Sequence, residues 1–291
     1  MADSFDLRCP VVTPMNEDGS VDLDGLETLV DYLVSSGIDG LVPCGTTGEF
    51  SALTDEERRA VVETTVDAAA ERVPVMAGVG GTAVGEVRRH VSEAEAVGAD
   101  SVLVVPPYFG GQSSADGNEA FFRAVLDDSP LPAYLYNIPQ TVGQELQVDA
   151  VAELADHDSV VGIKDSGGDL TYFGDLLRRT PDDFEVHQGW DAAYLPSLAM
   201  GADGGINALS HVCPDAFHEV AEAVAGGDLE RARRHQRETI DPVFEFCRDH
   251  GFAPSVKAAL AHRDLVDSGT VRPPLDSLRG EAFDELVTVL D

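Results

Sequence analysis

Lysine is almost absent from this chain, and that makes the surroundings of each lysine informative. Only Lys164 and Lys257 occur in 291 residues, beside 53 acidic residues. Lys164 follows the apolar run VVGI, where a buried strand is expected. A neutral lysine amine attacks ketones to form a Schiff base, and apolar surroundings favour the neutral form. We therefore interpret Lys164 as a nucleophile rather than a solvated residue, and Lys257, in APSVKAAL, as structural.

Two further motifs carry groups that could assist such a lysine. Tyr136, in YNIP, could move a proton to and from a ketone oxygen, or it could be an ordinary core aromatic residue. The turn CGTTGEF offers backbone N–H groups and the hydroxyls of Thr46 and Thr47, which suit a small carboxylate. Its glycines, Gly45 and Gly48, are equally typical of a tight turn that needs backbone freedom.

The elements that must position these groups form a regular alternation. Short β-branched runs predict strands, and longer amphipathic segments predict helices. Eight such units of about 30 residues indicate the α/β class, and specifically a (β/α)₈ TIM barrel over residues 1–212 with a helical extension over 213–291. An open doubly wound sheet is the alternative. We expect strands at 7–13, 38–43, 73–79, 101–105, 132–136, 159–163, 184–188 and 203–207, and helices at 22–36, 54–71, 83–97, 118–128, 147–156, 169–179, 191–200, 214–226, 228–248, 254–264 and 280–290.

In a barrel, the active site lies where the strands end and the βα loops begin. Lys164, Tyr136 and the GTTG turn all fall at expected strand ends, so the barrel predicts that they meet. Gly189 follows the seventh strand, and Ile206 closes the eighth. The stretch GGQSSADG, from 110 to 117, is expected to be a surface loop after the fourth strand.

The composition limits the kinds of molecule that the protein is expected to bind and the compartment in which it is expected to work. A formal net charge of −34, with carboxylates spread along the chain, predicts an acidic surface adapted to a salty cytoplasm and argues against binding nucleic acid. No apolar run approaches 18 residues and no signal peptide is evident, so a soluble, cytoplasmic protein is expected. Neither the histidines nor GVGGTAVG fits a metal or dinucleotide motif, so we expect no metal and no cofactor. The four cysteines (Cys9, Cys44, Cys213 and Cys247) are expected to be reduced.

Four motifs together resemble one enzyme superfamily. GTTGEFSALTDEER, YNIP, VVGIKDSGGD and GADGGINAL, in this order and spacing, are similar to the pyruvate-dependent class I aldolases, which include dihydrodipicolinate synthase, N-acetylneuraminate lyase and 2-keto-3-deoxygluconate aldolase. The resemblance implies a TIM barrel, a homotetramer and small-molecule substrates, namely pyruvate with an aldehyde, or a 2-keto-3-deoxy acid. It implies these roles: Lys164 as the Schiff-base residue, Tyr136 and Thr46 as a proton relay, Thr47 as the pyruvate carboxylate site, and Ile206, Gly45 and Gly189 as further substrate-binding positions.

Two departures from the dihydrodipicolinate synthase pattern indicate which members of the superfamily the chain resembles most. Thr141 stands where an arginine would grip the second substrate's carboxylate, and Phe109 replaces a tyrosine that would reach a neighbouring subunit. GIKDS also looks more like the sugar-acid members. We therefore expect a class I aldolase that cleaves a 2-keto-3-deoxy sugar acid, phosphorylated or not, to pyruvate and a glyceraldehyde. The alternatives are dihydrodipicolinate synthase, a 2-keto-3-deoxy acid dehydratase, a metal-dependent barrel lyase and a catalytically silent binding protein.

Overall fold

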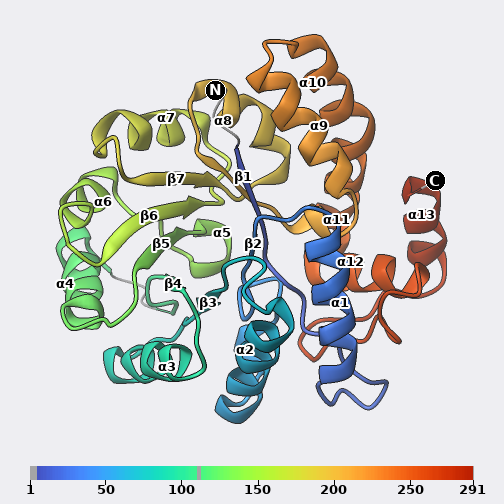
Figure 1. The fold of residues 1–291 in the computed structure, drawn as a ribbon, viewed down its shortest axis with the longest axis horizontal. Coiled ribbons are helices and arrows are strands. Elements are labelled where there is room, and N and C mark those ends of the chain that lie inside the picture. Colours follow the sequence, from blue (N-terminus) through green and yellow to red (C-terminus); the bar gives the residue numbers. More distant parts are fainter. Residues whose placement is uncertain (1–4, 110–112, 291) are drawn as a thin grey trace.

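Eight parallel strands form the centre of the molecule. The computed structural model describes residues 5–109 and 113–290, and in it the strands follow the order β2-β1-β8-β7-β6-β5-β4-β3. A parallel bridge between Leu41 and Val75 brings the two ends of this sheet together, so the strands form a nearly closed barrel (Figure 1). The strands are β1 (Asp6–Cys9), β2 (Gly40–Leu41), β3 (Met76–Gly78), β4 (Ser101–Val104), β5 (Ala133–Asn137), β6 (Val160–Asp165), β7 (Glu185–Gln188) and β8 (Gly204–Ile206).

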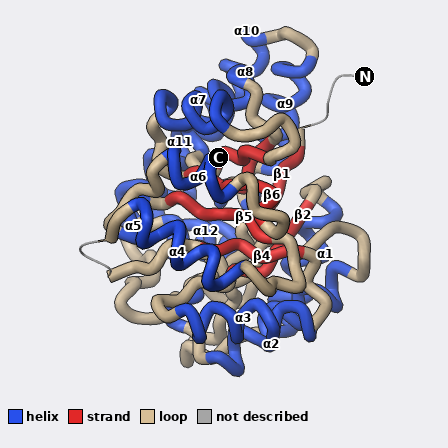
Figure 2. Tube along the Cα trace, turned by 90° about the vertical axis from the view of Figure 1, so that its left-hand side faces the viewer, coloured by secondary structure: helices blue, strands red, loops and turns tan. Residues whose placement is uncertain are grey.

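Helices surround the strands, as Figure 2 shows, and this confirms the expected (β/α)₈ TIM barrel. The helices between strands are α1 (Leu23–Ser35), α2 (Asp55–Ala69), α3 (Val84–Ala96), α4 (Ala115–Leu126), α5 (Pro139–Val142), α6 (Val148–Leu154), α7 (Leu170–Arg179) and α8 (Tyr194–Met200). After β8 come α9 (Pro214–Ala225), α10 (Leu229–His235), α11 (Asp241–His250), α12 (Phe252–His262) and α13 (Glu281–Leu290). In the described part of the chain, no helix has both the length and the apolar character that crossing a bilayer requires.

Local sequence explains several element boundaries. Thr54 caps α2, since its hydroxyl accepts from the Glu57 N–H at 3.2 Å while the Glu57 carboxylate accepts from the Thr54 N–H at 2.9 Å. The first strand ends at Cys9, earlier than expected, because Pro10 has no N–H to continue the ladder.

Three other expectations differ from the structure. Helix α4 begins at Ala115, inside the stretch expected to be a loop; residues 110–112 of that stretch lie outside the described residues. The helix expected over 191–200 is a 3₁₀ turn followed by α8. The helix expected over 228–248 becomes α10, a π-helical turn over Gln236–Ile240, and α11, which has Pro242 in its first turn.

Two apolar clusters hold the barrel together. The larger one fills the space between the strands and the outer helices. The smaller one lies inside the barrel and includes Tyr134, Tyr136 and Ile206. Because the interior is filled by side chains, only the two ends of the barrel offer space for polar chemistry.

Candidate active site

A cavity of about 580 Å³ opens at the carboxyl ends of the strands. Lys164 of β6, Tyr136 of β5 and Gly189, just after β7, line it. Thr46 and Thr47, from the turn after β2, line it as well. The structure thus brings together five of the residues that the sequence placed at strand ends.

Lys164 lies within its strand rather than behind it. It is the fifth residue of β6, it is only 4% exposed, and it pairs in register with Tyr136 on β5. Its Nζ atom lies 4.6 Å from the centre of the Tyr136 ring. An amine and a phenol are therefore neighbours at the base of the cavity, the arrangement that Schiff-base chemistry with proton transfer needs.

Gly189 provides the space that these groups occupy. A β-carbon at this position would lie 2.5 Å from Lys164 Cε and 2.2 Å from Ser166 Oγ, closer than atoms can approach. Ser166 is also buried and lines the cavity, and its hydroxyl has no hydrogen-bond partner among the described residues. A buried hydroxyl without a partner is costly, so Ser166 is a candidate contact for a bound substrate.

The turn after β2, residues 45–48, which we call the threonine turn, is held in place by several contacts. Thr13 donates a hydrogen bond to the Gly48 carbonyl at 2.7 Å, and a β-carbon on Gly48 would lie 2.8 Å from the Val11 carbonyl oxygen. Glu49, the next residue, forms an ion pair with Lys257 at 2.6 Å. Lys257 therefore has a structural contact, in line with its interpretation from the sequence.

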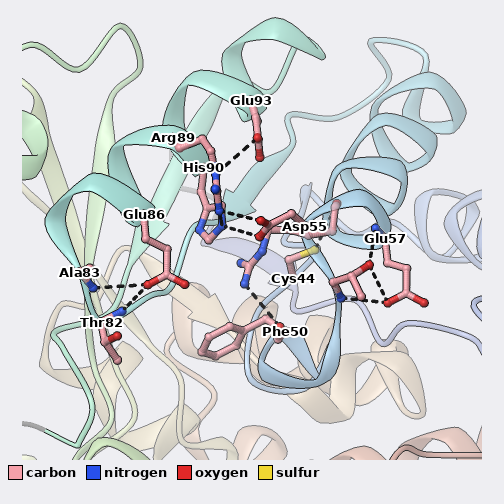
Figure 3. A network of polar contacts seen from close by, with 12 residues as sticks. Cys44, Phe50, Asp55, Glu57, Thr82, Ala83, Glu86, Arg89, His90 and Glu93 are labelled. Carbon is pink, nitrogen blue, oxygen red and sulfur yellow. Dashed lines mark hydrogen bonds and ion pairs between the residues drawn. The ribbon is translucent and has the colours of Figure 1, made fainter.

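Polar contacts also tie the start of α2, just beyond the turn, to α3 (Figure 3). Asp55 accepts a hydrogen bond from Arg89 at 2.7 Å, and its other oxygen lies 3.3 Å from His90 Nε2. Glu86 in turn accepts from the Thr82 N–H at 3.0 Å, which fixes the start of α3. These contacts join the segments that follow β2 and β3.

Asp191 is a cavity residue that the sequence interpretation missed. It is 1% exposed, and its Oδ1 accepts from the Leu209 N–H at 2.9 Å. Burial raises the pKa of Asp191 to about 6, although the Leu209 N–H and the nearby Lys164 charge oppose this rise. The signal available in the sequence was its place two residues after Gly189, at the end of β7.

Two expected substrate-binding residues do not line the cavity. Ile206 is fully buried in the apolar cluster inside the barrel, and Gly45 lines a much smaller void beside Thr46 and Tyr136. Conversely, Trp190 and Arg248 do line the cavity, and Arg248 comes from α11 in the C-terminal part of the chain. That contribution could not be read from strand ends.

The opposite, amino end of the barrel holds a second polar cluster, which we call the polar plug: Asp6, Arg8, Tyr134, Glu185 and His187. The ligand atoms of Asp6, Glu185 and His187 lie within 4.8 Å of one another, a spacing that a metal ion could use. Arg8 already takes the place of the cation, since it bonds Asp6 at 2.6 Å and Glu185 at 3.3 Å.

Comparisons with known proteins agree with this geometry. The sequence profile described as the dihydrodipicolinate synthetase family matches residues 5–291. The chain belongs to this family. The 4-hydroxy-tetrahydrodipicolinate synthase of Methanosphaerula palustris is 38% identical over 283 residues, or 96% of each chain. A dihydrodipicolinate synthase from Bacillus anthracis has a TM-score of 0.95 at 33% identity, covering 100% of this chain and 98% of that one. One from Acinetobacter baumannii, described as complexed with pyruvate, has a TM-score of 0.93 at 30% identity, covering 98% and 97%.

The two departures from the dihydrodipicolinate synthase pattern have definite places in the structure. Thr141 lines the cavity, so the missing arginine would have stood inside the site. Phe109 is 100% exposed, with a left-handed backbone φ of 67°. The homotetramer and the salt-adapted cytoplasmic setting stay predictions.

Proposed function

We propose that this enzyme joins pyruvate to an aldehyde through a Schiff base on Lys164, and that 4-hydroxy-tetrahydrodipicolinate synthase activity is the first candidate. The observation that carries the proposal is the buried Lys164 amine beside Tyr136, in a cavity that the threonine pair also lines. The names of the relatives favour the synthase over the sugar-acid aldolase expected from the sequence.

The proposed reaction begins when the Lys164 amine, having given up a proton, attacks the keto carbon of pyruvate. Loss of water gives an iminium, and loss of a methyl proton converts the iminium to an enamine. The enamine carbon then attacks the aldehyde and forms the new carbon–carbon bond, and the aldehyde oxygen takes up a proton. Addition of water, or of the product's own amine, to the iminium carbon then breaks its bond to Lys164, which releases the product and restores the Lys164 amine.

The chain's own groups can serve each of these steps. Tyr136 carries protons to and from the reacting oxygens, with Thr46 as its relay. Thr47 and the N–H groups of its turn hold the pyruvate carboxylate. The iminium is the electron sink, so these steps require no group beyond the chain's own residues.

The second candidate is cleavage of a 2-keto-3-deoxy sugar acid by the same iminium chemistry run in reverse. Three features favour it. Thr141 cannot make the bidentate grip that an arginine would give a carboxylate-bearing aldehyde. The unpartnered Ser166 hydroxyl and the Asp191 carboxyl are suited to bind substrate hydroxyl groups.

A comparison of two reactions decides between the candidates. Purified enzyme is given pyruvate with aspartate semialdehyde and, separately, 2-keto-3-deoxygluconate with and without phosphate, and kcat/KM is measured for each. The first candidate predicts faster condensation with the semialdehyde. Faster pyruvate release from a sugar acid would reverse the order. Borohydride reduction with pyruvate should attach an adduct to Lys164 in either case, and its absence would refute both.

A further inference from the structure

The second lysine of the chain is buried in an ion pair beside the cavity. Lys257 Nζ lies 2.6 Å from Glu49 Oε1, and their side chains are 0% and 1% exposed. The pair joins two distant parts of the chain, because Glu49 follows the threonine turn after β2 and Lys257 belongs to α12. Glu49 itself lines the cavity.

Stability alone is a poor explanation for this pair. Removing two charges from water is costly, and apolar residues of similar size often stabilise a fold as well or better. Burial lowers the pKa of Lys257, although the charge of Glu49 opposes this effect. Glu49 also adopts a left-handed backbone, with φ 56° and ψ 35°, a conformation that costs energy for a residue other than glycine. Buried charge and backbone strain at one residue next to a cavity are typical of functional sites.

Glu49 connects the C-terminal part of the chain to the threonine turn. Its backbone N–H donates to the Thr46 carbonyl at 3.1 Å, so Glu49 is bonded directly to the turn. Its second carboxylate oxygen accepts from the Arg272 N–H at 2.9 Å. The Arg272 side chain then binds the carbonyls of Ala52 and Gly19 at 2.8 and 2.9 Å. The turn is thus held by two segments that lie outside the barrel strands.

We propose that the Glu49–Lys257 pair is a positioning device that holds the threonine turn where Thr47 can bind the pyruvate carboxylate. This inference rests on the proposed function, since it assumes that pyruvate forms the iminium on Lys164. Both lysines of the chain then serve one site: Lys164 forms the bond, and Lys257 sets the geometry of the group that orients the keto acid.

The test uses Lys257→Met, Glu49→Gln and the double variant. Methionine matches the lysine chain in shape without its charge, and the double variant leaves neither charge buried without its partner. Val220→Ala is the matched control, because Val220 is fully buried in α9 and its truncation lowers stability without touching Glu49. For each protein, thermal unfolding is measured, together with the pyruvate concentration that gives half-maximal borohydride trapping on Lys164.

Positioning predicts a result that a purely stabilising pair would not give. In the double variant the melting temperature should recover towards that of the unmodified enzyme, while the half-maximal pyruvate concentration stays raised by roughly 10-fold or more, because small displacements in a binding site have large effects. The trapping rate at saturating pyruvate should change far less, since Lys164 lies on a different strand. The Val220→Ala control should bind pyruvate normally below its melting temperature.

Two outcomes are kept apart by this design. A double variant that folds and is half-saturated at the same pyruvate concentration as the unmodified enzyme would overturn the positioning role. If Lys257→Met alone does not fold, the half-maximal pyruvate concentration is compared in the double variant and in Glu49→Asp. The latter keeps both charges but has a shorter acidic side chain. Failure of the unmodified enzyme to form any pyruvate adduct would refute the proposed function instead.

Discussion

Both ends of the barrel contain charged and hydroxyl-bearing side chains. At the amino end these groups are paired with one another, whereas at the carboxyl end they face a cavity. The polar plug at the amino end pairs its charged groups with one another: Glu185 accepts from Tyr134 at 2.7 Å and lies 2.9 Å from His187, and Arg8 bonds both Asp6 and Glu185. Among the described residues, only the Nδ1 atom of His187 in this cluster is buried without a hydrogen-bond partner. At the carboxyl end, Lys164, Tyr136 and Ser166 face an open cavity. One end is closed by its own charges, and the other leaves polar groups available for a ligand.

The carboxyl groups at the two ends show the same contrast in their pKa values. The hydrogen bond with His187, supported by Tyr134 and Arg8, lowers the pKa of Glu185 to about 2. Burial raises the pKa of Asp191, at the cavity, to about 6. At Glu185 the hydrogen bonds and charges of its partners outweigh burial, whereas at Asp191 burial outweighs the Leu209 hydrogen bond and the effect of Lys164. The difference suggests that the plug serves stability and the cavity serves chemistry.

The largest effect should come from removing the cavity lysine. Lys164→Ala cannot form an iminium, so kcat/KM should fall by roughly 10⁴-fold or more, in the range seen when an enzyme loses its nucleophile. Arg8→Met, at the other end of the barrel, should lower the melting temperature because it leaves Asp6 and Glu185 without their cation, with catalysis unchanged. Steady-state kinetics and mass spectrometry after borohydride reduction check the first variant, and thermal unfolding together with the same kinetics checks the second. A Lys164→Ala protein that is still labelled would contradict the assignment.

Two tyrosines on β5 sharpen the comparison, because they lie two residues apart and differ in the end that they face. Tyr136→Phe should lower kcat by about 10²- to 10⁴-fold, since it removes the proton relay. Tyr134→Phe removes the hydrogen bond to Glu185 at 2.7 Å, which should cost about 1 kcal/mol and lower the melting temperature by about 2–4 °C. Kinetics and calorimetry on both variants are the measurement. Equal kinetic effects at the two positions would show that the ends are not functionally distinct.

Much of the barrel was predictable because its signals are local. β-Branched runs mark the strands, and caps such as the Thr54–Glu57 pair mark helix starts. Strand lengths were less predictable: Pro10, which has no N–H, follows the last residue of β1, and β2 is limited to Gly40–Leu41. The short helix α5 was missed because YNIPQTVG shows only a proline and no apolar period, although proline is favoured at the first helical position.

The site was predictable only where chemistry coincides with strand ends. Lys164 and Tyr136 meet as expected because adjacent parallel strands place residues in register. Ser166 and Asp191 each lie two residues beyond a position that stood out, Lys164 and Gly189, and neither residue type is unusual in a loop. The place of Arg248 in the cavity could not be predicted from the sequence, because only the packing of α11 against the barrel brings it there. Contacts that join segments far apart in the chain leave no local pattern in the sequence.

The smallest expected effect is a pH dependence of opposite sign at the two ends. Glu185 has a folded pKa of about 2, below its ordinary 4.5, so its contribution to stability is present above pH 4.5 and is lost as pH falls towards 2. Asp191 has a folded pKa of about 6, above its ordinary 3.8, so its contribution is present below pH 3.8 and is lost as pH rises through 6.

Amide variants separate these two contributions. Relative to the unmodified protein, Glu185→Gln should be destabilised most near neutral pH, and the difference should shrink as the pH falls below 4.5. The melting temperature of Asp191→Asn should instead rise relative to that of the unmodified protein between pH 4 and 7, because the amide removes the cost of ionising a buried carboxyl. Melting temperatures across pH 3–8 at constant ionic strength give both difference curves. If the two curves slope the same way, the pKa values of Glu185 and Asp191 are not shifted in opposite directions. The proposed contrast between the polar plug and the cavity would then be wrong.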